Sequence, residues 1–337
     1  MTNPVFEDGS PLPPPTAPKN ISVSIKNFQS DEHAERFAHV IANTVYTISR
    51  LIDLERLDGI TVAYNYDDAL VQLDRGYQPS RPPSRTSDGH NVGVAMSPAV
   101  LRAGVVKAHL LFLAPVVLPL EDLAHKDYQQ ALYIVAHECA HVEDFKNRDV
   151  CFPGTILQRQ ITDQEEAILE RFAGALWDEY AAYRASAIFG EAQTAIREEI
   201  FAKALPGARE RANAAIRSYR YHGNIDRVLE EAGSTLCEPL RFAAYLIGHV
   251  DGRNASLDDV PRARDLLSGS SYEPFVNRLR DVLRGLWLRR GRWTSLSEFK
   301  PLREIARDLL ADGGIILQPR NDGTLYVNIP FRQETMP

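Results

Sequence analysis

Two histidines four residues apart, His137 and His141, enclose Glu138 in the sequence His-Glu-Cys-Ala-His. Residues at this spacing on a helix project from the same side, so both imidazoles can reach one metal ion. Zinc suits such a pair of nitrogen ligands. Glu138 follows the first histidine directly, which places it to reach a water molecule on the metal rather than the metal itself. The spacing therefore predicts a zinc site with an adjoining general base.

The residues around this motif are uncharged. They comprise residues 133–136 before it and Cys139 and Ala140 inside it. This setting is typical of a buried helix that faces a cleft. The alternative, a surface helix with incidental histidines, needs a more polar neighbourhood.

A catalytic zinc usually takes three protein ligands and leaves one position for water, so a third ligand is expected. The metzincin pattern H-E-x-x-H-x-x-G-x-x-H would supply a histidine at position 147 after a glycine at position 144. These positions hold Asn147 and Asp144, which excludes that completion. Asp144 and Asp178 are instead candidate partners for a ligand imidazole N–H, and each can equally be an ordinary surface acid.

Glu179 is the third ligand that we expect. It stands in the middle of a stripe of apolar and small residues at helical spacing. The members of this stripe are Ile168, Phe172, Ala175, Glu179, Ala182 and Ser186. An unpaired buried carboxylate is costly, and a metal ion would remove that cost. The alternative is a salt bridge from Glu179 to an arginine such as Arg184. Glu165, Glu166 and Glu170 lie nearer the solvated start of the segment and are weaker candidates.

With this ligand set the chain resembles the gluzincins, zinc peptidases that carry H-E-x-x-H on one helix and a glutamate ligand on the next. Residues 179–185, Glu-Tyr-Ala-Ala-Tyr-Arg-Ala, also resemble the glutamate helix of compact ImmA/IrrE-type metallopeptidases. The resemblance covers about residues 60–190. The chain departs from the larger gluzincins in the 37 residues between His141 and Glu179, and in Tyr183, where their pattern has an aspartate.

The resemblance implies hydrolysis of a peptide bond in a peptide or protein substrate. Glu138 would deprotonate the attacking water and later protonate the leaving amine. A further donor should face the developing oxyanion, for which Tyr183 is the first candidate and His249 the second. Either can instead be a packing side chain. Zincin-type folds also bind peptide along an exposed sheet edge, and residues 92–96 are the expected edge strand.

The elements that must position these residues alternate between helix and strand in the first half. A helix is expected over residues 32–52, strands over 60–64, 92–96 and 105–113, and a proline-containing loop over 76–91. A helix starting within residues 120–127 runs into the histidine motif and ends before Pro153. A second one spans residues 162–189, with Thr162 and Asp163 as its capping signature.

The second half is expected to be mainly helical, because residues 192–290 show helical patterning broken by single prolines and glycines. Asn-Asp-Gly at residues 321–323, between two short strand patterns, predicts a terminal β-hairpin. The fold class is thus α+β. The expected organisation is a flexible proline-rich tail over residues 1–20, a zincin-like catalytic domain over 21–190, and a helical subdomain with the hairpin over 191–337.

Composition places the 337-residue chain among ordinary globular proteins, with 44% hydrophobic and 25% charged residues. The net charge of −7 argues against attraction of the whole molecule to nucleic acid or anionic membrane. Three scattered cysteines suit a reducing compartment, and neither a signal peptide nor a membrane segment is found. We therefore expect a cytoplasmic protein.

Two other functions are alternatives to the peptidase hypothesis. The same fold could serve a non-catalytic zinc-binding regulator. Residues 278–303 carry eight Lys and Arg residues against only Asp281 and Glu298. Together with the terminal hairpin, this basic segment could contact nucleic acid. Basic helices more often pack on acidic neighbours, so nucleic-acid binding is not the expected role.

Overall fold

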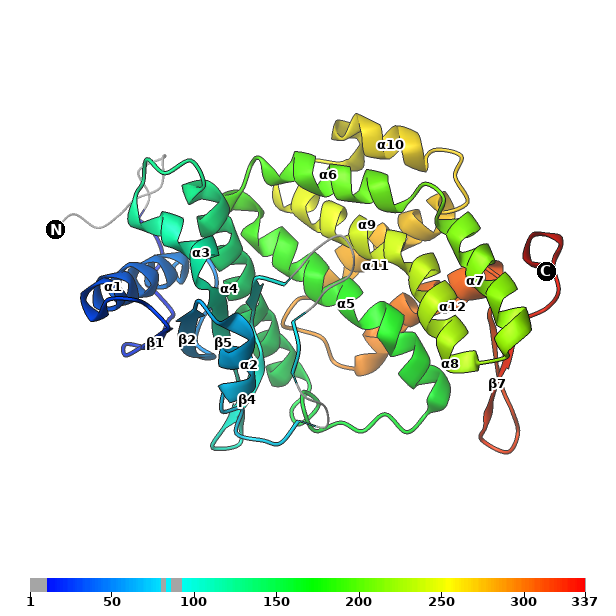
Figure 1. Ribbon diagram of the computed structural model, residues 1–337, viewed down its shortest axis with the longest axis horizontal. Helices are drawn as coiled ribbons and strands as arrows, with labels where there is room; N and C mark the ends of the chain where they lie inside the picture. The colour runs from blue at the N-terminus through cyan, green and yellow to red at the C-terminus, as the bar shows by residue number, and fades with distance from the viewer. Residues whose placement is uncertain (1–10, 80–82, 86–92, 337) are drawn as a thin grey trace. The chain divides into compact units, whose positions relative to one another are not determined.

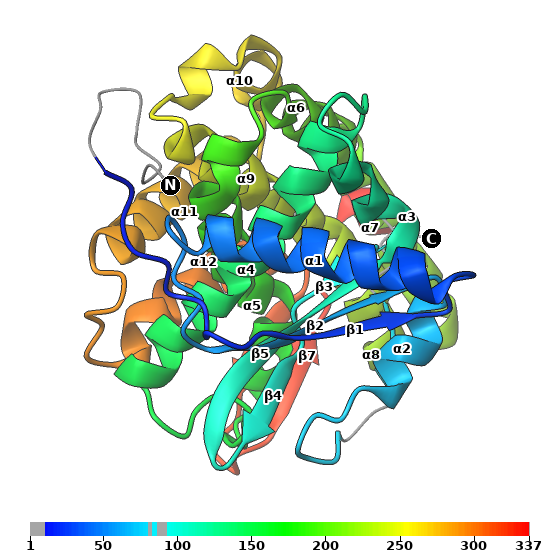
Figure 2. The same cartoon turned by 90° about the vertical axis from the view of Figure 1, so that its left-hand side faces the viewer.

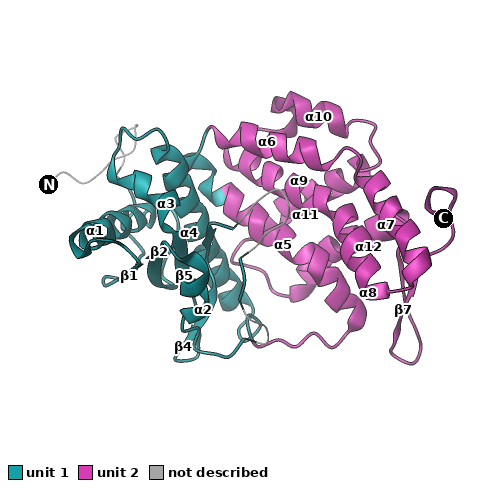
Figure 3. Ribbon diagram, viewed as in Figure 1, with its two compact units in different colours: residues 1–157, 185–191 teal, residues 158–184, 192–337 magenta. Residues whose placement is uncertain are grey.

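The computed structural model describes residues 11–79, 83–85 and 93–336. Its architecture is α+β, with a small mixed sheet, many helices and a C-terminal two-stranded hairpin, which confirms the predicted class (Figure 1). The chain forms two compact units: unit 1 holds residues 1–157 and 185–191, and unit 2 holds residues 158–184 and 192–337 (Figure 3). The sequence predicted a single boundary after residue 190. The structure differs because residues 158–184 belong with the helical half.

Unit 1 contains the sheet and the helix that carries the histidine motif. Its elements are β1 (Ser22–Lys26), α1 (Asp31–Ile48), β2 (Leu57–Ala63), α2 (Tyr66–Gln72), β3 (Ala95–Met96), β4 (Ala99–Arg102), β5 (Val105–Leu113), α3 (Ala114–Val117), the 3-10 helix η1 (Leu118–Glu121), α4 (Tyr128–Cys151) and the 3-10 helix η2 (Ala187–Phe189). The strand order is β1-β2-β5-β3, with β4 also paired to β5. β1, β2 and β5 are parallel, whereas β3 and β4 run antiparallel to β5.

Helices cover both faces of this sheet (Figure 2). α4 contacts β5 and β3, and α1 contacts α4 and β1. α2 contacts β2 and β5, and its Tyr66 packs with Leu111 and Met96. Leu111 and its sequence neighbour Leu110 point to opposite faces of β5, and both are fully buried. β5 therefore forms the buried centre against which α4 is placed.

The N-terminal half differs from the sequence prediction at three places. The helix expected to start within residues 120–127 starts at Tyr128, because η1 and a hydrogen-bonded turn at Asp122 precede it. The strands β1 and β4 and the short helices α2 and α3 were not predicted. The expected flexible tail is fixed from Thr16, which bonds the Ser49 carbonyl at 2.8 Å and accepts from the Leu54 N–H at 2.9 Å. Residues 1–10, 80–82 and 86–92, which include parts of the predicted tail, loop and edge strand, lie outside the described residues.

A polar network is buried beside the sheet of unit 1. His109 on β5 bonds Thr61 Oγ1 through Nε2 at 2.8 Å and Asp58 Oδ2 through Nδ1 at 3.0 Å. Arg102 donates two further hydrogen bonds to the Asp58 carboxylate, at 2.8 and 3.0 Å. Burial alone would raise the pKa of Asp58, but these donors and their charges hold it below its ordinary value. The network therefore fastens β2 to β5 and β4.

Unit 2 is helical apart from the hairpin. Its elements are α5 (Gln164–Ser186), whose last two residues belong to unit 1, α6 (Gln193–Ala204), α7 (Ala208–His222), α8 (Ile225–Val228), the π-helix η3 (Leu229–Gly233), α9 (Ser234–Gly252), η4 (Leu257–Asp259), α10 (Pro261–Leu267), α11 (Glu273–Leu288), η5 (Leu296–Phe299), α12 (Lys300–Asp312), β6 (Ile316–Pro319), β7 (Leu325–Asn328) and η6 (Gln333–Thr335). The predicted hairpin is confirmed as β6 and β7. Among the described residues, no helix combines the length and apolar character needed to cross a membrane.

α5 and α9 approach each other closely in unit 2. A Cβ placed on Gly248 of α9 would lie 2.5 Å from the Tyr180 carbonyl oxygen, so only glycine fits there. Asp163 accepts a hydrogen bond from the Glu166 N–H at 2.7 Å, as its predicted capping role requires. Next to Gly248, His249 is fully buried, and burial followed by the charges of Arg197 and Arg253 lowers its pKa to about 4.

We expect Asp58→Asn to lower the free energy of unfolding by about 2 kcal/mol at pH 7, because it removes a charged acceptor from a buried network. The folded-state pKa of Asp58 is depressed, so its contribution is fully present above the unfolded value of about 3.9 and is lost as the pH falls below it. Urea unfolding at pH 7 and at pH 3 checks both points. An equal difference between the two proteins at both pH values would contradict the assignment.

The buried His249 predicts a second pH effect of known direction. Its folded-state pKa of about 4 lies below the ordinary value of 6.5. Between these two pH values, His249 is mainly protonated in the unfolded chain and mainly neutral in the folded protein. Stability should therefore fall by about 2 kcal/mol from pH 7 to pH 5 because of this residue. Urea unfolding of His249→Gln should lack that increment. His39 is exposed, so the His39→Gln variant serves as the control and should show the same loss of stability as the wild type.

Candidate metal centre

The two histidines of the motif lie side by side on α4. Their ring centroids are 4.9 Å apart and the ring planes are perpendicular, and both side chains are half-buried. Val135, Ala136 and Cys139, on the opposite side of the same turns, are fully buried. The helix thus buries its apolar side and leaves both imidazoles partly exposed, whereas the predicted cleft in front of them stays a prediction.

Glu138 is buried, and its carboxylate has a definite hydrogen-bond donor. The Ser97 hydroxyl lies 2.7 Å from Glu138 Oε2 and 2.9 Å from the Glu138 carbonyl oxygen. Ser97 follows β3 at the sheet edge and is itself buried. The candidate base is therefore tied to the edge of the sheet.

The charge of the Glu138 carboxylate affects the pKa of two neighbouring groups. Burial and, next, the charge of Glu138 raise the pKa of the Tyr66 hydroxyl, which keeps this group protonated. The same two causes raise the pKa of the Cys139 thiol well above its ordinary value. A protonated buried thiol is a poor nucleophile and a poor metal ligand, so Cys139 is a packing residue of α4.

Glu179 lies on α5 and is half-buried. Together with one nitrogen each of His137 and His141, a carboxylate oxygen of Glu179 completes a group of three possible metal donors. Arg184, the expected partner in the salt-bridge alternative, engages Asp251 at 3.3 Å and stacks over Trp287 at 4.6 Å from the ring centroid. Two imidazoles and one carboxylate match the donor set of catalytic zinc sites.

The stripe that pointed to Glu179 is not uniformly buried. Ala182 and Ser186 are buried, but Ala175 is exposed, so burial does not extend along the whole stripe. The tight approach of α5 occurs instead on the side of Tyr180, where Gly248 of α9 meets it. The sequence therefore placed Glu179 correctly on a helix but overestimated how enclosed that face is.

The two oxyanion-donor candidates, Tyr183 and His249, meet at one arginine in unit 2. Arg197 donates a hydrogen bond to the Tyr183 hydroxyl at 2.9 Å, and its charge contributes to the lowered pKa of His249. The Tyr183 ring also stacks on Tyr245, with centroids 4.8 Å apart. With this lowered pKa, His249 is neutral at pH 7. Their catalytic role stays a prediction.

Asp144, a candidate partner for a ligand imidazole, is completely buried on α4. It forms an ion pair with Arg148 one turn later, at 2.8 Å from Nε to Oδ2. Asp144 is therefore not a surface acid, and its contact with a ligand imidazole stays a prediction.

Sequence patterns did not reveal Ser97. Its contact with Glu138 spans 41 residues, and neither periodicity nor motif spacing encodes such a distant pair. The available signal was weak: Ser97 is the polar residue between the predicted edge strand and Pro98.

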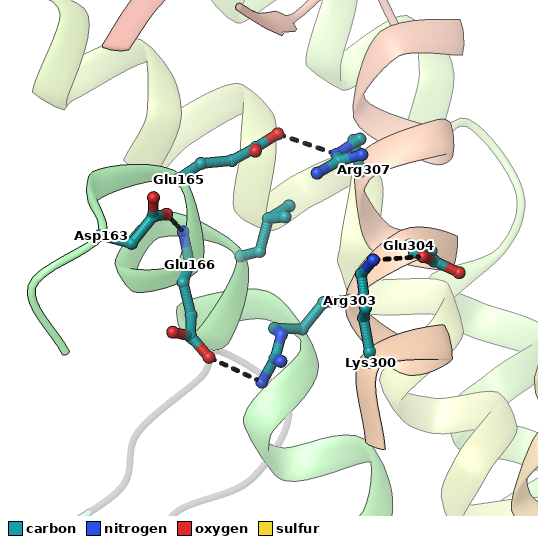
Figure 4. Close-up of a pocket in the computed structure, with 8 residues that line it drawn as sticks. Asp163, Glu165, Glu166, Lys300, Arg303, Glu304 and Arg307 are labelled. Carbon is teal, nitrogen blue, oxygen red and sulfur yellow. Dashed lines mark hydrogen bonds and ion pairs between the residues drawn. The ribbon is translucent and has the colours of Figure 1, made fainter. Parts of the chain in front are cut away.

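The basic segment is largely paired with acids within unit 2. Arg303 of α12 contacts Glu166 at 3.1 Å and Glu170 at 3.3 Å, and Arg278 contacts Asp308 at 2.6 Å. Arg307, just beyond the segment, contacts Glu165 at 2.8 Å (Figure 4). The Arg303–Glu166 and Arg307–Glu165 pairs line a cavity of about 210 Å³ between the start of α5 and α12. This pairing agrees with the expectation that the basic segment packs on acidic neighbours. It leaves the nucleic-acid hypothesis without a supporting observation.

Comparison with known proteins adds no relative. No family model matches the chain, and no curated protein or solved structure matches it. Inference about function therefore depends on the site residues themselves.

Proposed function

We propose that this protein is a zinc-dependent metallopeptidase. The observation that carries the proposal is the arrangement on α4, where a buried glutamate with a hydroxyl donor directly follows the first of two half-buried histidines whose rings are adjacent. A buried carboxylate beside two imidazoles at a partly open surface is an expensive arrangement for a purely structural helix. It is the arrangement that water activation needs.

The donor atoms suit zinc. His137, His141 and Glu179 would hold the ion, and the half-buried state of all three leaves room for water or substrate. Zinc in such a site supplies Lewis-acid polarisation of a carbonyl and makes water nucleophilic at neutral pH. Carboxylate and imidazole ligands with no thiolate favour a catalytic over a purely structural zinc.

The chain's own residues would move the proton. The Glu138 carboxylate takes a proton from the attacking water and delivers it to the nitrogen of the leaving amine, so no net proton is gained or lost at Glu138. A donor such as the Tyr183 hydroxyl or, as second candidate, His249 would stabilise the negative charge that develops on the carbonyl oxygen.

A peptide or protein is the substrate class that the sheet favours. β3 and β4 lie at the edge of the sheet and pair with β5 on one side. A sheet edge offers main-chain donors and acceptors to an extended chain, and this mode of binding tolerates many side chains. Ser97, between the two strands, bonds the proposed base directly. The edge and the base therefore belong to one local structure.

Metal analysis of purified variants tests the proposal. We expect His137→Ala, His141→Ala and Glu179→Ala each to weaken zinc binding by more than about 100-fold, because each removes a ligand rather than a supporting partner. Glu138→Gln should keep zinc at the wild-type stoichiometry. It should cleave a peptide library about 10²- to 10⁴-fold more slowly, because the amide cannot accept the proton.

Glu170→Ala, on the same helix as Glu179, is the matched control and should bind zinc normally. Tight zinc binding by Glu179→Ala would remove this residue from the ligand set. Zinc-loaded wild type that cleaves no member of a broad library, together with full biological activity of Glu138→Gln, would favour the non-catalytic zinc-binding regulator instead.

A further inference from the structure

Ser97 and Pro98 stand between β3 and β4 without changing the register of the strand pairing with β5. Met96 of β3 pairs with Leu111, and Ala99 of β4 pairs with Ala108, so the two short strands continue one antiparallel alignment along β5. The Pro98 carbonyl still accepts a hydrogen bond from the His109 N–H at 3.0 Å. Only the missing N–H of proline breaks the ladder. Ser97 is therefore held by strand pairing on both sides.

The Ser97 side chain points to the face of the sheet that α4 covers. In this alignment Ser97 stands opposite Leu110, and side chains paired across an antiparallel ladder share a face. Its hydroxyl lies 2.7 Å from Glu138 Oε2 and 2.9 Å from the Glu138 carbonyl oxygen. Ser97 and Glu138 are each only 7% exposed. This contact is thus sheltered from competing water.

A hydroxyl that donates to a carboxylate forms a charge-assisted hydrogen bond, which is stronger than one between neutral groups. Glutamate has three rotatable side-chain bonds, so a carboxylate without a fixed donor would sample several positions. The bond to Oε2 limits this motion and leaves Oε1 as the oxygen for the attacking water. Catalysis by a general base depends on such placement.

We propose that Ser97 is a positioning residue that holds the Glu138 carboxylate in its proton-accepting orientation from the sheet edge. This inference rests on the proposed peptidase function. It adds a physical link between the strand that would bind the peptide and the group that would activate water. Ser97 acts through Glu138 and does not itself touch the reacting atoms.

The full-length Ser97→Ala and Ser97→Thr variants test the proposal with kinetics on a peptide that the wild type cleaves. We expect Ser97→Ala to bind zinc at the wild-type stoichiometry and to lose about 10- to 100-fold in kcat with an unchanged KM. Ser97→Thr keeps the hydroxyl and should recover most of kcat. Ser49→Ala removes another buried hydroxyl of unit 1, one that donates to the Tyr46 carbonyl at 2.7 Å, and should keep wild-type kcat.

Unchanged kcat in Ser97→Ala would overturn the proposal. So would an equal loss in Ser49→Ala, or a failure of Ser97→Thr to recover activity. A crystal structure of Ser97→Ala gives a second readout that needs no turnover. There the Glu138 carboxylate should leave its wild-type position or occupy several, and one unchanged position would overturn the inference. If the wild type cleaves no peptide, the peptidase function fails, and this structural readout still decides whether Ser97 orients Glu138.

Discussion

The packing of α4 against β5 is the constraint on which the candidate site depends. α4 must bury Val135, Ala136 and Cys139 while His137 and His141 remain half-buried. The helical period allows both, because residues two positions apart in the sequence lie on nearly opposite sides of a helix. Glu138 lies between these two sides, which explains why it is buried and yet close to the histidines. A rotation of α4 about its axis would bury the imidazoles or expose the apolar side, so the packing of this helix fixes the orientation of all three residues.

β5 transmits this constraint to the sheet edge. It contacts α4 through one face and holds β3 and β4 through its backbone, so the position of Ser97 relative to Glu138 follows from strand register. A slip of one residue would turn Ser97 to the other face and take its hydroxyl away from the carboxylate. The close contact of helix and strand is thus specified by elements that also form the core. A second helix, α5, carries Glu179, and its position within unit 2 depends on the close approach at Gly248.

Local patterns in the sequence were sufficient for part of this architecture. The i, i+4 histidines, the uncharged residues around them and the Asn-Asp-Gly turn encode their structures within a few residues, and α4 and the terminal hairpin were predicted from them. β1 and β4 are short, and they take their strand form from pairing with β2 and β5, which no local pattern records. The Ser97–Glu138 bond was missed for the same reason. The exposure of Ala175 could not be predicted either, because residue spacing defines a face of a helix but not what covers that face.

Unit 1 contains a second set of residues with the geometry of a catalytic group, and the comparison shows why distance alone does not define a site. Thr61, His109 and Asp58 are connected like a hydroxyl nucleophile, its base and an orienting carboxylate, at 2.8 and 3.0 Å. However, Thr61 is 4% exposed and stands on β2, between β1 and β5, where no substrate carbonyl can approach its hydroxyl. Asp58 is also shared with Arg102, which ties it to strand pairing. The histidines of α4 can bind a metal ion and are also partly exposed. They are therefore the better candidates for a functional site.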